Sequence, residues 1–203
     1  MLTVVLIVPA RRRAELFAFR SKALVYLTGC LAAIPFLTQF AISAATCEQN
    51  PSWKFSISSA LAITLIILAR ALTEEILYRW ILWSALSRIG FRIPALIVLT
   101  AIIFAAFHAW KLSSWVSWVY VFSAGLLLGL VRFATDSVLL ATLVHTCWNL
   151  ASGLLYGMTH VAGIPETTPA VLCKTTGTIH PLDLLGITVS VAAIAIFLRR
   201  RRT

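Results

Sequence analysis

Polar side chains capable of catalysis are rare in the apolar stretches of this chain, and most of them fall into three short motifs. The motifs are Glu74, Glu75 and Arg79; Phe104 and His108; His145 and Asn149. A glutamate, alone or together with a histidine, can take a proton from water. A histidine or an asparagine can donate a hydrogen bond to the oxyanion that forms when water attacks an amide carbonyl. The three motifs therefore predict amide hydrolysis, provided that the folded chain brings them together.

Each motif also has an ordinary structural explanation, because residues four apart share one face of a helix. Glu75 and Arg79 could form an ion pair that lets both charges survive in an apolar helix. Arg70 and Glu74 have the same spacing and could form a second pair, but this explains Glu74 less well, because one acid would be enough to offset Arg79. The other two motifs could be polar pairs that hydrogen-bond between packed helices. The combination of motifs, more than any one of them, favours catalysis.

The same residue types could instead form a metal site. Two histidines and a glutamate, with water as the fourth ligand, are a known zinc hydrolase arrangement that Glu74, His108 and His145 could supply. The usual zinc-binding helix, with two histidines four apart and a glutamate after the first, is absent from the sequence. No serine or cysteine stands in a recognised catalytic pattern. We therefore favour water activation by glutamate without a cofactor, with zinc as the alternative.

The composition places the helices that carry these motifs in lipid. Of 203 residues, 60% are hydrophobic and 12% are charged, and the mean hydropathy is +0.93. So few charges cannot cover a water-soluble protein of this size. Stretches of roughly 20 apolar residues span a bilayer as helices. Six such stretches are predicted, at 23–45, 56–88, 93–110, 115–132, 137–157 and 182–198. The expected fold is all-α, a polytopic transmembrane bundle of about six to eight helices.

Helix geometry indicates that the motifs can meet. Glu74 lies about 16 residues before the turn near Gly90 and His108 about 16 residues after the same turn, so both stand about 24 Å above it. His145 lies about 10 residues after the next turn on that side, or about 15 Å above it. The levels agree to within one or two helical turns, which helix tilt can absorb.

Basic residues near the ends of the spans predict the orientation of the chain. The formal net charge is +10, but no nucleic-acid-binding motif accompanies it, so nucleic acid is not expected as a partner. Lysine and arginine gather at one side of the predicted spans, at Arg11, Arg12, Arg13, Arg20, Lys22, Arg88, Arg92, Arg132 and Arg199 to Arg202. The opposite loops hold only Lys54, Lys111 and Lys174. Because cytoplasmic loops are rich in lysine and arginine, both termini are predicted to be cytoplasmic. Tryptophans near the outer ends suit an aromatic interface belt: Trp53, Trp110, Trp115 and Trp118.

The chain is expected to form a single domain, 1–203, with a motif core at 56–157, an outer loop at 158–181 and a basic cytoplasmic tail at 199–203. Whether Met1 to Ala10 enters the membrane is left open. Cys47 and Cys173 fall in the two predicted non-cytoplasmic loops, and a disulfide between them is a hypothesis that rests on this shared compartment.

The three motifs, in this order and spacing, resemble those of the CPBP family, which comprises the type II CAAX prenyl proteases and bacterial bacteriocin-processing and immunity relatives, also called the ABI family. The resemblance spans residues 74–149. It implies that Glu74 and His108 activate water and that His145 and Asn149 stabilise the oxyanion. Glu75 and Arg79 would support the site, Phe104 would line it, and no metal would be needed. The resemblance also favours a bacterial inner-membrane location.

Together these arguments predict a glutamic intramembrane endopeptidase. Its substrate would be a membrane-associated protein or peptide, processed at a CAAX-type sequence or at a C-terminal sorting signal. The alternative is a membrane protein without enzymatic activity, either an immunity or binding protein or a small transporter, because buried acids and histidines also serve proton-coupled transport. Transport is less favoured since we detect no inverted repeats and no helix pairs broken by glycine or proline.

Overall fold

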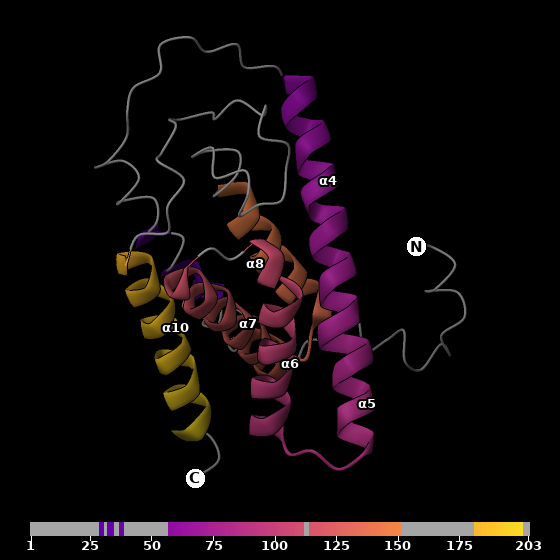
Figure 1. Ribbon diagram of the computed structural model, residues 1–203, viewed down its shortest axis with the longest axis vertical. Helices are drawn as coiled ribbons and strands as arrows, with labels where there is room; N and C mark the ends of the chain where they lie inside the picture. The colour runs from indigo at the N-terminus through magenta and orange to yellow at the C-terminus, as the bar shows by residue number, and fades with distance from the viewer. Residues whose placement is uncertain are drawn as a thin grey trace.

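The described part of the protein is entirely helical (Figure 1). The structure, a computed structural model, describes residues 29–30, 32–34, 37–38, 57–111, 114–151 and 181–200. Its elements are α4 (Ile57–Glu75), η1 (Ile76–Leu82), α5 (Trp83–Arg88), α6 (Ile93–Phe107), η2 (Ala109–Lys111), α7 (Trp115–Thr135), α8 (Val138–Leu150) and α10 (Pro181–Arg200). The all-α helical bundle expected from the sequence is confirmed. Met1 to Ala10, both cysteines of the hypothetical disulfide, Cys47 and Cys173, and most of the predicted outer loop lie outside the described residues.

The second predicted span, 56–88, is one continuous helix made of α4, η1 and α5. No glycine or proline interrupts it, but η1 is a π-helix, in which the backbone hydrogen bonds run to the fifth residue along. The helix ends at Gly90, whose φ of 94° is a left-handed conformation that a glycine adopts without strain. Arg92 is extended, and Pro94 stands in the first turn of α6, where its missing N–H costs nothing.

Helices α6 and α7 pack closely because α7 carries small residues where they meet. A Cβ atom added at Gly125 would lie 3.0 Å from the Cα atom of Ala101 in the α6 backbone. One turn later, a Cβ atom at Gly129 would lie 3.3 Å from the Cγ2 methyl of Ile97. The backbone of α7 therefore comes within reach of side chains that belong to neighbouring helices.

A two-residue connection turns the chain from α7 into α8. Asp136 has a φ of 58° and ends α7, and its backbone N–H donates to the carbonyl of Arg132. Ser137 then caps α8, because its hydroxyl oxygen accepts from the backbone N–H of Leu140 at 3.1 Å. Around this corner α10 packs on α7, and α4 packs on α8. The core includes side chains with almost no exposure, among them Leu96, Leu127, Val131, Ile187 and Ile194.

Of the helices that the structure describes, α7 alone is both long and apolar enough to span a membrane by itself. The predicted spans at 93–110 and 137–157 correspond to shorter apolar helices, α6 and α8. α6 is shorter than predicted because the chain turns at His108, which caps its end. Helix α4 carries acidic and basic side chains in its last turns, yet it exposes large apolar residues such as Leu61, Leu65 and Ile66. Exposed apolar faces of this kind suit contact with lipid.

Candidate active site

Three of the predicted site residues meet inside the bundle. Glu74 is the penultimate residue of α4, His108 follows the end of α6, and His145 lies in the middle of α8. The Oε2 atom of Glu74 lies 3.8 Å from the Nε2 atom of His108 and 3.8 Å from the Nε2 atom of His145. This oxygen is buried and accepts no hydrogen bond within the described structure. One carboxylate oxygen from α4 thus faces the imidazoles of His108 and His145, which come from other parts of the bundle.

The other nitrogen of each imidazole has a partner that fixes its hydrogen. The Nδ1 atom of His108 lies 2.8 Å from the backbone oxygen of Phe104, and the Nδ1 atom of His145 lies 2.9 Å from the Oε1 atom of Glu75. A carbonyl and a carboxylate only accept, so both Nδ1 atoms carry hydrogen and donate. In a neutral imidazole this leaves the Nε2 atom as an acceptor. Each Nε2 lone pair therefore faces Glu74, and the three facing atoms are all acceptors.

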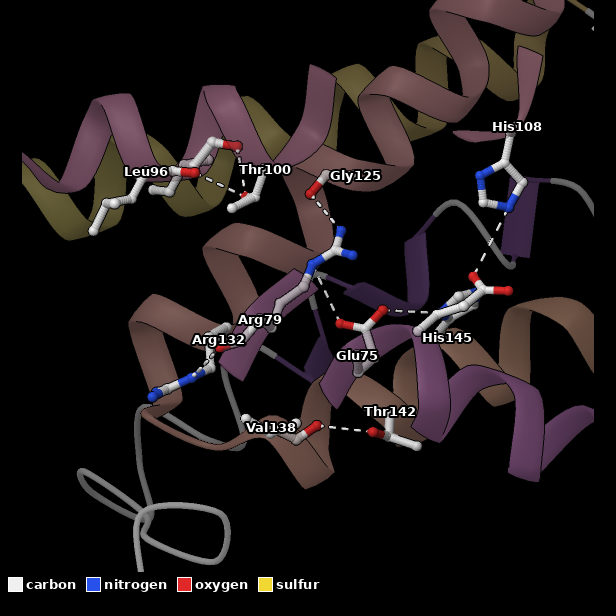
Figure 2. Close-up of polar contacts among 12 residues, drawn as sticks. Glu75, Arg79, Leu96, Thr100, His108, Gly125, Arg132, Val138, Thr142 and His145 are labelled. Atoms are coloured by element: carbon white, nitrogen blue, oxygen red, sulfur yellow. Dashed lines mark hydrogen bonds and ion pairs between the residues drawn. The ribbon is translucent and has the colours of Figure 1, made fainter. Parts of the chain in front are cut away.

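Glu75 and Arg79 form the predicted ion pair, which is fully buried. The Nε atom of Arg79 lies 3.3 Å from the Oε2 atom of Glu75, and both side chains have 0% exposure. One NH2 group of Arg79 donates to the backbone carbonyl of Gly125 in α7 at 3.0 Å (Figure 2). The guanidinium carbon also lies 4.7 Å from the ring centre of Phe104. Glu75 is thereby held between a guanidinium and His145, which ties α4 to α7 and α8.

The π-helical turn after Glu75 receives a further contact that was not predicted from the sequence. The Nε atom of Arg132 donates to the backbone carbonyl of Arg79 at 3.3 Å, and its guanidinium forms an ion pair with Asp136. In the sequence, Arg132 served only as a marker of orientation. In the structure it is almost completely buried. The spacing of four between Arg132 and Asp136 is the local signal that could have indicated a structural role.

A cavity of about 60 Å³ adjoins these residues. The candidate residues that line it are Glu74, Phe104, His108, His145 and Asn149. It has room for several water molecules, because a cavity needs about 10–15 Å³ of this volume to hold one. It is smaller than the roughly 300–1,000 Å³ of typical ligand pockets. The structure thus places all four predicted catalytic residues around one small hollow, with Phe104 as part of its wall.

Aromatic side chains that were not predicted as site residues also shape the cavity. The ring of Phe104 lies between those of His108 and His145, with centroid distances of 4.5 and 5.9 Å. Tyr120 and Trp148 line the same cavity, and the indole N–H of Trp148 donates to the Tyr120 hydroxyl at 2.6 Å. Their partnership joins residues 28 apart on α7 and α8, so no local spacing could predict it.

The carboxylate and imidazoles do not have the spacing of a zinc site as they stand. Adjacent ligand atoms around a tetrahedral zinc ion lie about 3.3 Å apart when the bonds are about 2.0–2.1 Å long. The two distances from Glu74 to the imidazoles are 3.8 Å. Within the described residues, no three histidine, cysteine, aspartate or glutamate side chains are arranged to hold a metal ion.

Comparison with known proteins finds a family similarity. Residues 56–151 match the sequence model of the type II CAAX prenyl endopeptidase Rce1-like family. No curated protein and no solved structure matches the chain. The matched segment begins beside α4 and ends just after α8, and it contains all three motifs. Members of this family are integral membrane proteins, and their activity is that of a CAAX-type intramembrane endopeptidase acting on membrane-associated proteins. Over residues 56–151, the chain is similar to the Rce1-like family of type II CAAX prenyl endopeptidases, as its three motifs predict.

Proposed function

We propose that this protein cleaves a peptide bond of a membrane-associated protein with a water molecule that Glu74 and His108 activate. The observation that carries the proposal is the convergence of the Glu74 carboxylate on the two imidazole Nε2 atoms, at 3.8 Å each. A distance of 3.8 Å is too long for a direct hydrogen bond and suits a bridging water. Because the facing atoms are acceptors, they can take both hydrogens of that water and leave an oxygen lone pair for attack.

The reaction then proceeds as an ordinary amide hydrolysis. The water oxygen forms a bond to the carbonyl carbon while one of its protons passes to Glu74. The carbonyl oxygen becomes an oxyanion, to which the carboxamide of Asn149 donates a hydrogen bond. When the carbon–nitrogen bond breaks, the leaving nitrogen takes the proton that Glu74 accepted from water, which restores the carboxylate. Atoms and charges balance without a cofactor.

His145 can assist the oxyanion only in its protonated form. Its Nδ1 hydrogen is already donated to Glu75, so the Nε2 atom donates only when a second proton makes the ring an imidazolium. In this proposal Glu75 orients His145 and compensates its charge, and the water-activating base is Glu74.

The decisive experiment replaces the carboxylate of Glu74 by an amide of the same size. Glu74→Gln keeps the size of the side chain, so the protein should insert and accumulate normally while processing falls to background. The matched control is Thr73→Ala, which changes the neighbouring hydroxyl, a group bonded to its own helix at Ala69. Mass spectrometry of membrane-protein termini would compare wild type with both variants. Normal processing by the Glu74→Gln protein would refute the mechanism.

Zinc is a second candidate because three inward-facing acceptors can also hold a cation. Movement of the imidazoles by a few tenths of an ångström would be required. The non-metal mechanism predicts that the purified protein keeps its activity after treatment with 1,10-phenanthroline and contains no stoichiometric zinc by elemental analysis. Loss of activity that added zinc restores would instead make Glu74, His108 and His145 metal ligands.

A further inference from the structure

The two ends of the bundle differ strongly in charge. Arg88 and Arg92 flank the short connection between α5 and α6, and α10 finishes on Arg199 and Arg200. These segments lie together at the lower end of Figure 1, and Arg132 stands in the last turn of α7, at the corner that leads into α8. Toward the opposite end, the basic residues among those described are Lys111 in η2 and Arg70, which lies one turn beyond Glu74 in α4 and lines the cavity. Short connections rich in arginine remain in the cytoplasm, so the arginine-rich end is the cytoplasmic one.

The catalytic cluster lies toward the other end. His108 follows the last residue of α6, which begins beside Arg92, and Asn149 lies in the last turn of α8. Along α7 the cavity is lined from Tyr120, in the second turn, to Leu128. Arg132 lies about twelve residues beyond Tyr120, a rise of about 18 Å. The reacting groups and the arginine-rich end are therefore separated by a large part of the bundle.

Exposed tryptophans mark the depth of the site. Trp110 lies in η2 and Trp115 begins α7, and the two residues are 79% and 73% exposed. Tryptophan gathers where lipid headgroups meet the hydrocarbon core. His108 lies only two residues from Trp110, so the cluster lies close to the membrane surface at the end poor in arginine.

Buried side chains lie between the site and the arginine-rich end of the bundle. Below the imidazoles lie Glu75 and Arg79, and then the side chains of Leu127, Val131 and Val138, all of which have exposures of 0 or 1%. Hydrolysis consumes water, and these described side chains have almost no contact with solvent between the imidazoles and the arginine-rich end. The described packing therefore favours access of water and substrate to Glu74 from the opposite side.

From these observations we infer that the active site opens to the non-cytoplasmic face of the membrane. Its substrates are then proteins whose scissile bond lies next to a membrane span in a segment that has already crossed the bilayer. This inference rests on the proposed proteolytic function and specifies its substrate class. A protein modified and anchored from the cytoplasmic side would present its scissile bond to the wrong end of the bundle.

The orientation can be measured without any substrate. Ala109→Cys and Ser87→Cys place one thiol beside His108 and one beside Arg88, at exposed positions in the full-length protein. The native cysteines are first replaced by alanine, because Cys30 and Cys147 are exposed thiols. A membrane-impermeant maleimide applied to intact spheroplasts should label Ala109→Cys at once and Ser87→Cys only after permeabilisation. The reverse pattern overturns the inference.

The substrate class is tested separately by mapping cleavage sites. Termini that appear in cells with the wild-type protein and disappear with Glu74→Gln should map to the exported side of their proteins, close to a predicted span. Termini that map to cytoplasmic segments would overturn the inference while supporting proteolysis. If no termini differ, the proposed function fails, and the labelling experiment still decides the orientation.

Discussion

Glu74 and Glu75 are neighbours in the sequence but have different surroundings. Glu75 is fully buried between Arg79 and His145, whereas Glu74 is partly exposed at the cavity. Consecutive side chains of a helix point about 100° apart, so Glu74 and Glu75 can contact different neighbouring helices. One acid therefore supports the fold of the site, and its neighbour supplies the chemistry that we propose.

This difference predicts that the same substitution, glutamate to glutamine, changes stability at one of the two positions and not at the other. Glu75→Gln leaves the Arg79 guanidinium buried without a counter-charge and should lower the free energy of unfolding by about 3 kcal/mol. Glu74→Gln should leave stability nearly unchanged. Thermal unfolding of both purified variants in one detergent would compare them. Equal melting temperatures would mean that the ion pair does not stabilise the fold.

Asn149 is expected to act in the transition state. Asn149→Ala removes a hydrogen-bond donor that meets charge only when the oxyanion forms, so kcat should fall by about 100-fold or more while KM changes little. Cys147→Ala on the exposed side of the same helix serves as the control. An effect confined to KM would show that Asn149 binds substrate and plays no part in stabilising the oxyanion.

At the scale of elements, the site depends on how closely α7 approaches its neighbours. Gly125 contributes both the close contact with Ala101 and the carbonyl that accepts from Arg79. The connection from α7 to α8 through Asp136 then sets the height of His145. The positions of the reacting groups thus depend on backbone contacts as much as on the side chains themselves.

Two glycines one turn apart offer a matched test. Gly125→Ala would press a methyl group against the α6 backbone, which cannot rotate away, and should cost about 1–3 kcal/mol and much of the activity. Gly129→Ala would place its methyl group 3.3 Å from the Cγ2 methyl of Ile97 and 3.6 Å from the Ile97 Cα atom, the latter an ordinary van der Waals contact, so its effect should be smaller. Melting temperature and processing would be measured together. Similar losses in both variants would contradict this explanation.

At the scale of the molecule, local periodicity in the sequence predicted the helices from 57 to 150 and from 181 to 200 approximately, and the level of the site along them; most of the predicted span 23–45 lies outside the described residues. Apolar runs located the helices, the spacing of four paired Glu75 with Arg79, and counting residues from the turns brought Glu74 level with His108. The contact of Arg132 with Arg79 joins residues 53 apart, and the π-helical turn has no sequence pattern of its own. Such features depend on which helices pack together, so periodicity could not reveal them.

The short helix α6 has a consequence for the surrounding lipid. It has 15 residues and a length of about 22 Å, against a hydrocarbon thickness of about 30 Å. A bilayer adjusts to a short helix by thinning locally. The end of a substrate helix that arrives beside α6 would then leave the hydrocarbon early and fray. Its last turn would become extended backbone at the depth where the proposed hydrolysis takes place.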